Sequence, residues 1–320
     1  MFQVTAIGGG GTADSKFGYA NGPRVNGAGN SFVNPLPSYL YLFDSTDVRR
    51  DVTIAPYDVQ VNGISKTGMA ITAMRDGKYR RDWISNPVVS PTSAVQYFGL
   101  KWQLIRYSDV LLMFAEAENE INGATAAAYD AVNMVRRRGY GLPISSTSAV
   151  DIPAGLSKAD FFKYLVRERA LELGAEGIRK YDLIRWNLLG QGLKEANDNM
   201  ALMGLRSTTS MSYTYMAGYP TYAAVPANLP SNMYFRSAAP LPGGDNSSIW
   251  VHSYYKTNTN PGTADYTSVA WVNSTLTTTM ITPTIPRYGY INFKTGKSEL
   301  FPIPQTAREA NKNLTQNPLY

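Results

Sequence analysis

The most regular pattern of apolar and polar residues in this 320-residue chain runs from residue 101 to residue 190. The stretch RYSDVLLMFAEAENEI, residues 106–121, places apolar residues at steps of four, three and four, at Val110, Phe114, Ala117 and Ile121. Residues with this spacing lie on one face of an α-helix. The pair Asn122-Gly123 that follows is typical of a helix end. The sequence therefore predicts an amphipathic helix whose apolar face carries these four residues.

A second helix is predicted in the stretch ATAAAYDAVNMVRRR, residues 124–138, followed by Gly139 as a stop. Three arginines fill its last turn, where positive charge suits the negative end of the helix dipole. Its apolar face comprises Ala128, Ala131, Val132 and Val135. Because small alanines allow close approach, we expect the two helices to form an antiparallel hairpin.

A third helix is predicted to begin at Ser157, where the hydroxyl caps the helix and Asp160 follows three residues later. Its apolar side comprises Phe162, Leu165, Val166 and Leu173. Gly174 and Gly177 interrupt it. A shorter helix then carries Tyr181, Ile184 and Leu188 and is predicted to end at Gly190.

The remaining chain lacks long helical periods. Residues 1–100 mix short strand-like runs with loops rich in Gly, Pro and Asn, and residues 191–320 are predicted to be irregular. The sequence thus predicts one domain, 1–320, of mainly α class. It consists of a loop-rich segment 1–100, a helical segment 101–190 and an aromatic, loop-rich segment 191–320, with only a few short strands.

Composition excludes several kinds of site. The chain has no cysteine, so disulfides, thiol nucleophiles and Cys-ligated metal sites are impossible. It has one histidine, His252, so metal sites with several histidines are excluded. No serine lies in a G-x-S-x-G motif. Composition therefore excludes thiol chemistry and multi-histidine metal sites and disfavours a Ser-His-Asp triad; we expect no catalytic residue, no metal site and no cofactor.

The charge pattern does not favour a nucleic-acid partner. The formal net charge is +6, but the dense basic runs, residues 75–83 and 136–138, are short, and the first contains acids. No apolar run approaches the roughly 18 residues of a membrane span. The N-terminus has neither a basic segment nor the apolar run of a signal peptide. It is predicted to form a strand, residues 2–7, that enters a loop at Gly8–Gly11 without the ending of a phosphate loop.

The stretch RERALELGAEGIRKYDLIRW, residues 167–186, gathers four arginines, one lysine and four acids. Acids and bases there are spaced three or four residues apart, as in Arg169 with Glu172, which makes opposite charges neighbours on a helix. Catalytic carboxylates would instead need to face a cleft with separated pKa values. The sequence favours a stabilising network over a catalytic site. Glu116 and Glu118 are expected to pair with Arg106 or Arg136, as buried ion pairs.

The candidate ligand contacts lie in loops that are rich in aromatics. Residues 207–286 contain eleven aromatics and four charged residues. Sugars present apolar C–H faces and a rim of hydroxyls, so flat aromatic rings beside polar side chains are suited to bind them. The alternative for each ring is burial against the helices. The candidate residues are Trp250, Tyr254, Tyr255, Asn246, Asp245, Trp271, Tyr19, Asn21 and Arg24. His252 is either a hydrogen-bonded loop residue or a further ligand contact.

Three long motifs resemble the SusD/RagB family, in the order that the family has them. They are residues 105–141 (IRYSDVLLMFAEAENEINGATAAAYDAVNMVRRRGYG), the charged stretch 167–186, and the C-terminal ELFPIPQTAREANKNLTQNPLY, where Leu319 replaces a usual glycine. The resemblance runs from Phe2 to the end and covers the C-terminal part of the family's length. It implies a fold of tetratricopeptide-like helical hairpins, of α-α superhelix type. It also places Trp83, Trp102 and Trp186 in scaffold motifs, where burial is expected.

What the resemblance implies about function is a role in nutrient uptake. Family members are lipoproteins of the outer membrane at the cell surface, and they are not enzymes. They bind glycans, or peptides in the RagB branch, and cap a TonB-dependent SusC-like transporter. The expected function is non-catalytic binding of an oligosaccharide or polysaccharide and its delivery to that transporter.

Alternatives to this function stay open. A RagB-like peptide-binding role is the first, and a glycoside hydrolase using Asp245 and Asp265 is the second. Residues corresponding to the family's signal peptide, lipidated cysteine and earlier repeats are not found in the sequence. We therefore expect the chain to be a truncation, a proteolytic product or the result of a late start codon.

Overall fold

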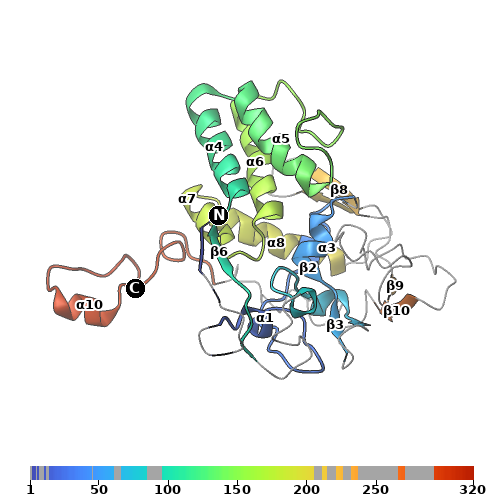
Figure 1. Ribbon diagram of the computed structural model, residues 1–320. Coiled ribbons are helices and arrows are strands. Elements are labelled where there is room, and N and C mark those ends of the chain that lie inside the picture. The colour runs from blue at the N-terminus through green and yellow to red at the C-terminus, as the bar shows by residue number, and fades with distance from the viewer. Residues whose placement is uncertain are drawn as a thin grey trace.

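A computed structural model of the chain places most of its helices in one body (Figure 1). The described residues are 2–4, 6, 11, 14–44, 46–60, 66–84, 96–204, 211–214, 221–225, 232–236, 266–270 and 292–320. The helices are α1 (Phe17–Ala20), α2 (Pro37–Leu40), α3 (Arg49–Thr53), α4 (Tyr107–Asn122), α5 (Ala126–Gly139), α6 (Lys158–Glu172), α7 (Arg179–Arg185), α8 (Leu189–Gly204) and α10 (Gln305–Ala310).

Helices α4, α5 and α6 pack side by side around the main apolar core (Figure 1). The four residues predicted for the apolar face of the second helix are all buried there. Leu112, Phe161 and Leu165 are fully buried in the same cluster, and each such side chain contributes about 1.5–3 kcal/mol. The predicted antiparallel hairpin is confirmed as α4 and α5.

The predicted face of α4 is wrong. Phe114 is 47% exposed and Ile121 79% exposed, and Val110 and Ala117 are also exposed. The buried face instead carries Leu112, Ala115 and Asn119. Apolar residues surround most of this helix, so more than one face satisfies the helical spacing. Contact with α5 and α6 decides between them.

The predicted helix start at Ser157 is confirmed. Its hydroxyl accepts a hydrogen bond from the backbone N–H of Asp160 at 3.1 Å. Helix α5 has a similar cap, Thr125, which was not predicted. Gly139 is the last residue of α5 and does not follow it as a stop. A side chain there would overlap the guanidinium of Arg49.

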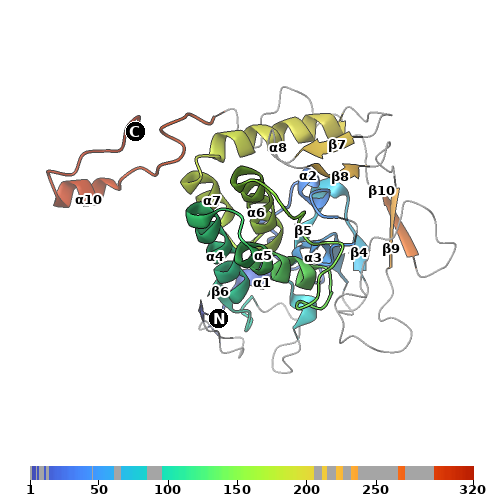
Figure 2. The same ribbon diagram turned by 90° about the horizontal axis from the view of Figure 1, so that it is seen from above.

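Helix α8 was missed, because the prediction ended the helical region at Gly190. The structure begins α8 at Leu189, so Gly190 lies in its first turn. A side chain at Gly190 would overlap the ring of Phe293, so this glycine permits close packing. Figure 2 shows α8 running beside α2, with which it makes contact.

The strands are short, as predicted. They are β1 (Phe2–Val4), β2 (Ile54–Ala55), β3 (Tyr57–Val59), β4 (Lys66–Gly68), β5 (Arg75–Asp76), β6 (Trp102–Ile105), β7 (Met211–Thr214), β8 (Thr221–Val225), β9 (Asn232–Arg236) and β10 (Tyr266–Ala270). In the described part of the chain they form antiparallel pairs: β1 with β6, β2 with β5, β3 with β4, β7 with β8 and β9 with β10. The C-terminal segment that carries α10 extends away from the body (Figures 1 and 2).

Candidate functional site

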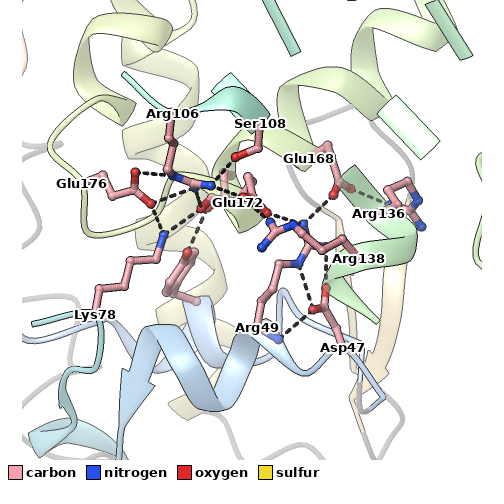
Figure 3. A network of polar contacts seen from close by, with 12 residues as sticks. Asp47, Arg49, Lys78, Arg106, Ser108, Arg136, Arg138, Glu168, Glu172 and Glu176 are labelled. Carbon is pink, nitrogen blue, oxygen red and sulfur yellow. Dashed lines mark hydrogen bonds and ion pairs between the residues drawn. The ribbon is translucent and has the colours of Figure 1, made fainter. Parts of the chain in front are cut away.

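The charged stretch 167–186 forms part of a buried network of ion pairs (Figure 3). Glu172, at the end of α6, has a side chain that is 2% exposed. Three guanidiniums converge on its carboxylate, those of Arg49, Arg106 and Arg138. Burial alone would raise the pKa of Glu172, but the three cations hold it well below its usual value. This acid is therefore ionised and held in place.

Glu168, one turn earlier, is held in the same way. Its carboxylate accepts hydrogen bonds from Arg49 at 2.6 Å and Arg136 at 2.7 Å, and its side chain is fully buried. Although burial opposes it, these two guanidiniums lower the pKa of Glu168. Asp47 completes the cluster by accepting from Arg49 at 2.7 Å. Glu168 is thus shared between two cations, whereas burial raises the pKa of Asp47 although Arg49 opposes the change.

Glu176 follows α6 and extends the network to Lys78 and Arg106. It accepts from Arg106 at 2.8 Å and pairs with Lys78. The Lys78 ammonium also donates to the backbone carbonyl of Glu172 at 2.7 Å. Burial lowers the pKa of Lys78, although Glu176 opposes the change. The network joins α3, α5, α6, the start of α4 and the segment between β5 and β6. Its role is therefore structural.

The predicted partners of Glu116 and Glu118 are wrong. Glu116 does not pair with Arg106 or Arg136. It accepts from Arg185 at 2.7 Å and from the indole N–H of Trp186 at 2.7 Å. Glu118 bonds to Asn122 and Thr125 instead. The prediction failed because partners distant in sequence cannot be chosen from spacing along one helix.

The predicted ion pair between Arg169 and Glu172 is wrong for the same reason. Arg169 does not pair with Glu172, but with Asp109 and Asp182, each at 2.8 Å. Within residues 167–186 the described ion pair at a spacing of three is Arg185 with Asp182. The preference for a structural network over a catalytic pair agrees with this geometry. The pairs are buried and join different elements, so removing one partner leaves a buried charge uncompensated, which costs more than breaking an exposed ladder.

A pocket of about 420 Å³ lies beside this network. Its volume is within the range of small-molecule sites. One wall is aromatic: the ring of Phe17 stacks on Tyr79 with centroids 5.0 Å apart and lies 5.7 Å from the ring of Trp102. The lining residues are Phe17, Asn21, Val33, Tyr79, Trp102, Ala175, Glu176, Gly177, Arg179 and Lys180.

Gly18 and Gly22 allow the close packing that places Phe17 on the pocket wall. A side chain at Gly18 would overlap Leu100 and Arg81, and one at Gly22 would overlap the backbone carbonyl of Tyr79. Without side chains at these positions, α1 packs directly on the segment that carries Tyr79. Phe17 and Asn21, at the two ends of α1, then line the pocket.

The opposite wall is the loop between α6 and α7. Ala175 and Gly177 take left-handed backbone conformations, with φ of 64° and 82°. The conformation is unfavourable for alanine, and the surrounding contacts must hold it. Between them Glu176 directs its carboxylate to Lys78 and Arg106. The network therefore fixes one wall of the pocket.

The predicted ligand residues are placed only in part. Asn21 lines the pocket, whereas Tyr19 lies against the Arg81 guanidinium, 5.4 Å from its ring centroid, and Arg24 is exposed outside the pocket. The predicted residues Asp245, Asn246, Trp250, Tyr254, Tyr255 and Trp271, together with His252, lie outside the described residues.

The prediction of a buried Trp102 is wrong. Its side chain is 37% exposed and lies on the pocket wall. Lys180 and Tyr79 were also missed as pocket residues. Trp102 lies on β6 and is paired with Val4 of β1.

The described residues contain neither a metal-binding cluster nor a membrane-spanning helix. No group of three or more His, Asp or Glu side chains is arranged to hold a metal ion in this part of the chain. No helix among the described residues is long and apolar enough to cross a membrane.

Sequence comparison assigns the chain to a family. The sequence profile of the SusD family matches residues 8–320. The chain belongs to the SusD family. SusD-like protein P25 of Formosa agariphila is 41% identical to it over 86 residues, which are 27% of this chain and 15% of that protein. SusD-like protein P2 of the same organism is 28% identical over 172 residues, 51% of this chain and 32% of that one.

Comparison with solved structures confirms the fold. The SusD homologue from Bacteroides thetaiotaomicron superimposes on the chain with a TM-score of 0.62 and 24% identity. The alignment covers 99% of this chain and 51% of that one. The mainly α SusD fold is therefore confirmed. The chain spans about half the length of this relative and less of the two SusD-like proteins.

Proposed function

We propose that this protein binds an oligosaccharide or polysaccharide at the cell surface, without altering it, and delivers it to a TonB-dependent SusC-like transporter. The observation that carries the proposal is the SusD family match over residues 8–320. SusD proteins are glycan-binding proteins of the outer membrane and are generally not catalytic. The family resemblance implies a lipid anchor, which would hold the protein at the outer membrane.

The described geometry supports binding over catalysis. A glycoside hydrolase needs two carboxyl groups facing each other across the substrate, about 5–9.5 Å apart. Glu168, Glu172 and Glu176 are each held by cations in a buried network. Asp245 and Asp265 lie outside the described residues, so a direct assay for hydrolysis belongs in the test.

The proposed ligand contacts are the aromatic and polar residues of the loops. An aromatic ring stacks on the apolar face of a sugar, and neighbouring amides and carboxylates bind its hydroxyls. Trp250, Tyr254 and Tyr255 supply the rings, with Trp271 as a further one. Asp245 and Asn246 supply the polar contacts, and Tyr19, Asn21 and Arg24 extend the set.

The test is affinity electrophoresis of the 320-residue protein through gels containing glucans, xylans, mannans or galactans, with peptide binding and release of reducing sugar measured in parallel. Retardation by one glycan without release of sugar supports the proposal. Binding of peptides alone, or release of sugar, refutes it. Trp250→Ala should weaken retardation, and Phe32→Ala, which removes a ring that is 73% exposed, is the matched control.

Delivery needs its own experiment. An affinity tag on the protein should recover a SusC-like transporter from detergent-solubilised outer membranes. Recovery of glycan-bound protein without such a transporter would refute the delivery step and leave glycan binding in place.

A further inference from the structure

The pocket between α1 and the α6–α7 loop lies beside the buried network and is lined partly by aromatic residues. Its aromatic wall is continuous from Tyr79 through Phe17 to Trp102. Trp102 is held by the pairing of β6 with β1, opposite Val4, yet 37% of its surface is exposed. A large aromatic ring fixed on a strand and left open beside a cavity is available for a ligand.

Polar groups line the same cavity. Among the described residues, no hydrogen bond engages the side-chain amide of Asn21. Lys180 makes no ion pair in the described part of the chain, and its ammonium lies 4.3 Å from the ring centroid of Phe301. Gly177 can contribute only backbone atoms. Arg179 also lines the cavity, but its guanidinium donates to the backbone carbonyl of Val166 at 3.0 Å. Besides this group, the cavity offers one amide, one ammonium and peptide groups around an aromatic wall.

Charge selects among ligands. The carboxylate of Glu176 is neutralised by Lys78 and Arg106, so it does not make the cavity anionic. Burial raises the pKa of Tyr79, so its phenol is neutral at physiological pH. Lys180 donates hydrogen bonds but accepts none, and Asn21 does both. These groups suit a molecule with one apolar face and several oxygen atoms at its edge.

We propose that this pocket is a binding subsite for one pyranose ring of the glycan, which stacks on Trp102 while Asn21 and Lys180 bind its hydroxyls. None of the residues named for this subsite comes from segment 207–286. The inference rests on the proposed function, because a pyranose ligand presupposes that the protein binds glycan.

The experiment is isothermal titration of the 320-residue protein with oligosaccharides of the glycan that retards it in gels. Trp102→Ala is expected to weaken binding about fivefold or more, the loss of one aromatic contact. Asn21→Ala and Lys180→Ala should each weaken it less. Tyr107→Ala is the matched control, since this ring is 68% exposed but does not line the pocket, and affinity should be unchanged.

The outcomes separate the two proposals. If the protein binds none of the glycans, the proposed function fails and the subsite fails with it. If the protein binds glycan and all three pocket variants bind as tightly, the subsite is refuted while the function stands. Circular dichroism checks that each variant is folded. Should Trp102→Ala unfold, Asn21→Ala and Lys180→Ala decide the matter, because Asn21 makes no described side-chain hydrogen bond and Lys180 makes no described ion pair.

Discussion

Replacement of Glu172 by glutamine tests whether the buried network stabilises the fold. Glutamine has nearly the same shape but no charge, so Arg49, Arg106 and Arg138 would face one another with less compensation (Figure 3). Leaving buried charge uncompensated is costly, whereas the pair itself is weak evidence for net stability. The variant therefore measures the cost of breaking the network and not its net worth.

The expected magnitude follows from burial. The side chains of Arg49 and Arg106 are 7% and 17% exposed, whereas Arg138 is 47% exposed and contributes little. Breaking a buried pair costs about 3–5 kcal/mol, and glutamine can still accept a hydrogen bond, so we expect about 3 kcal/mol. At roughly 2 °C per kcal/mol in a large domain, Tm should fall by about 6 °C.

The assay is urea denaturation followed by circular dichroism, at several pH values. Because the pKa of Glu172 is lowered in the fold, its contribution is present above the ordinary glutamate pKa of about 4.3 and is lost as pH falls below that value. The difference between wild type and Glu172→Gln should therefore shrink in acid. Glu120 forms an ion pair with Lys158, and its side chain is 64% exposed. Glu120→Gln should therefore change stability by less than about 0.5 kcal/mol. A loss below about 1 kcal/mol at neutral pH for Glu172→Gln would contradict the reasoning.

Three further predictions concern stability. Leu112→Ala should cost about 2–5 kcal/mol, while Ile121→Ala, at an exposed position of the same helix, should stay within about 0.5 kcal/mol by urea denaturation; equal losses would show that the observed face of α4 is wrong. Ser157→Ala should cost about 1 kcal/mol by loss of the cap, and Ser157→Gly only a few tenths; no loss in either would argue against the cap. Burial raises the pKa of Asp76 to about 6, so stability present below the ordinary value of about 3.9 is lost as pH rises through 6. Asp76→Asn should therefore raise Tm at about pH 7.5 more than at about pH 4, and an equal change at both would exclude this cause.

The helical elements could be predicted because their signals are local. Ser157 caps the helix that begins beside it, and the alanines of α5 share one face at fixed spacing. Each of these signals uses only residues within a few positions of one another. The family was likewise recognisable from three motifs in order along the chain.

The contacts between elements could not be predicted from such signals. The buried face of α4 depends on which neighbours pack against it, and the partners of Glu116 come from a helix some seventy residues later. Helix α8 was missed because Gly190 indicates a helix end by its local preference, while its actual role is to admit the ring of Phe293. Local preference and packing disagree at that position, and packing prevails.

The candidate pocket shows the same division between what is local and what is not. The aromatic and polar residues of the wall come from α1, the segment after β5, β6, the α6–α7 loop and the start of α7, so no single stretch of sequence contains the site. The charged stretch 167–186 connects these elements through the ion pairs of Glu176. Glu176 is drawn toward Lys78 and Arg106, and this holds Ala175 in a left-handed conformation that alanine alone disfavours. In the proposed subsite, residues 167–186 therefore fix the part of the lining that the α6–α7 loop forms.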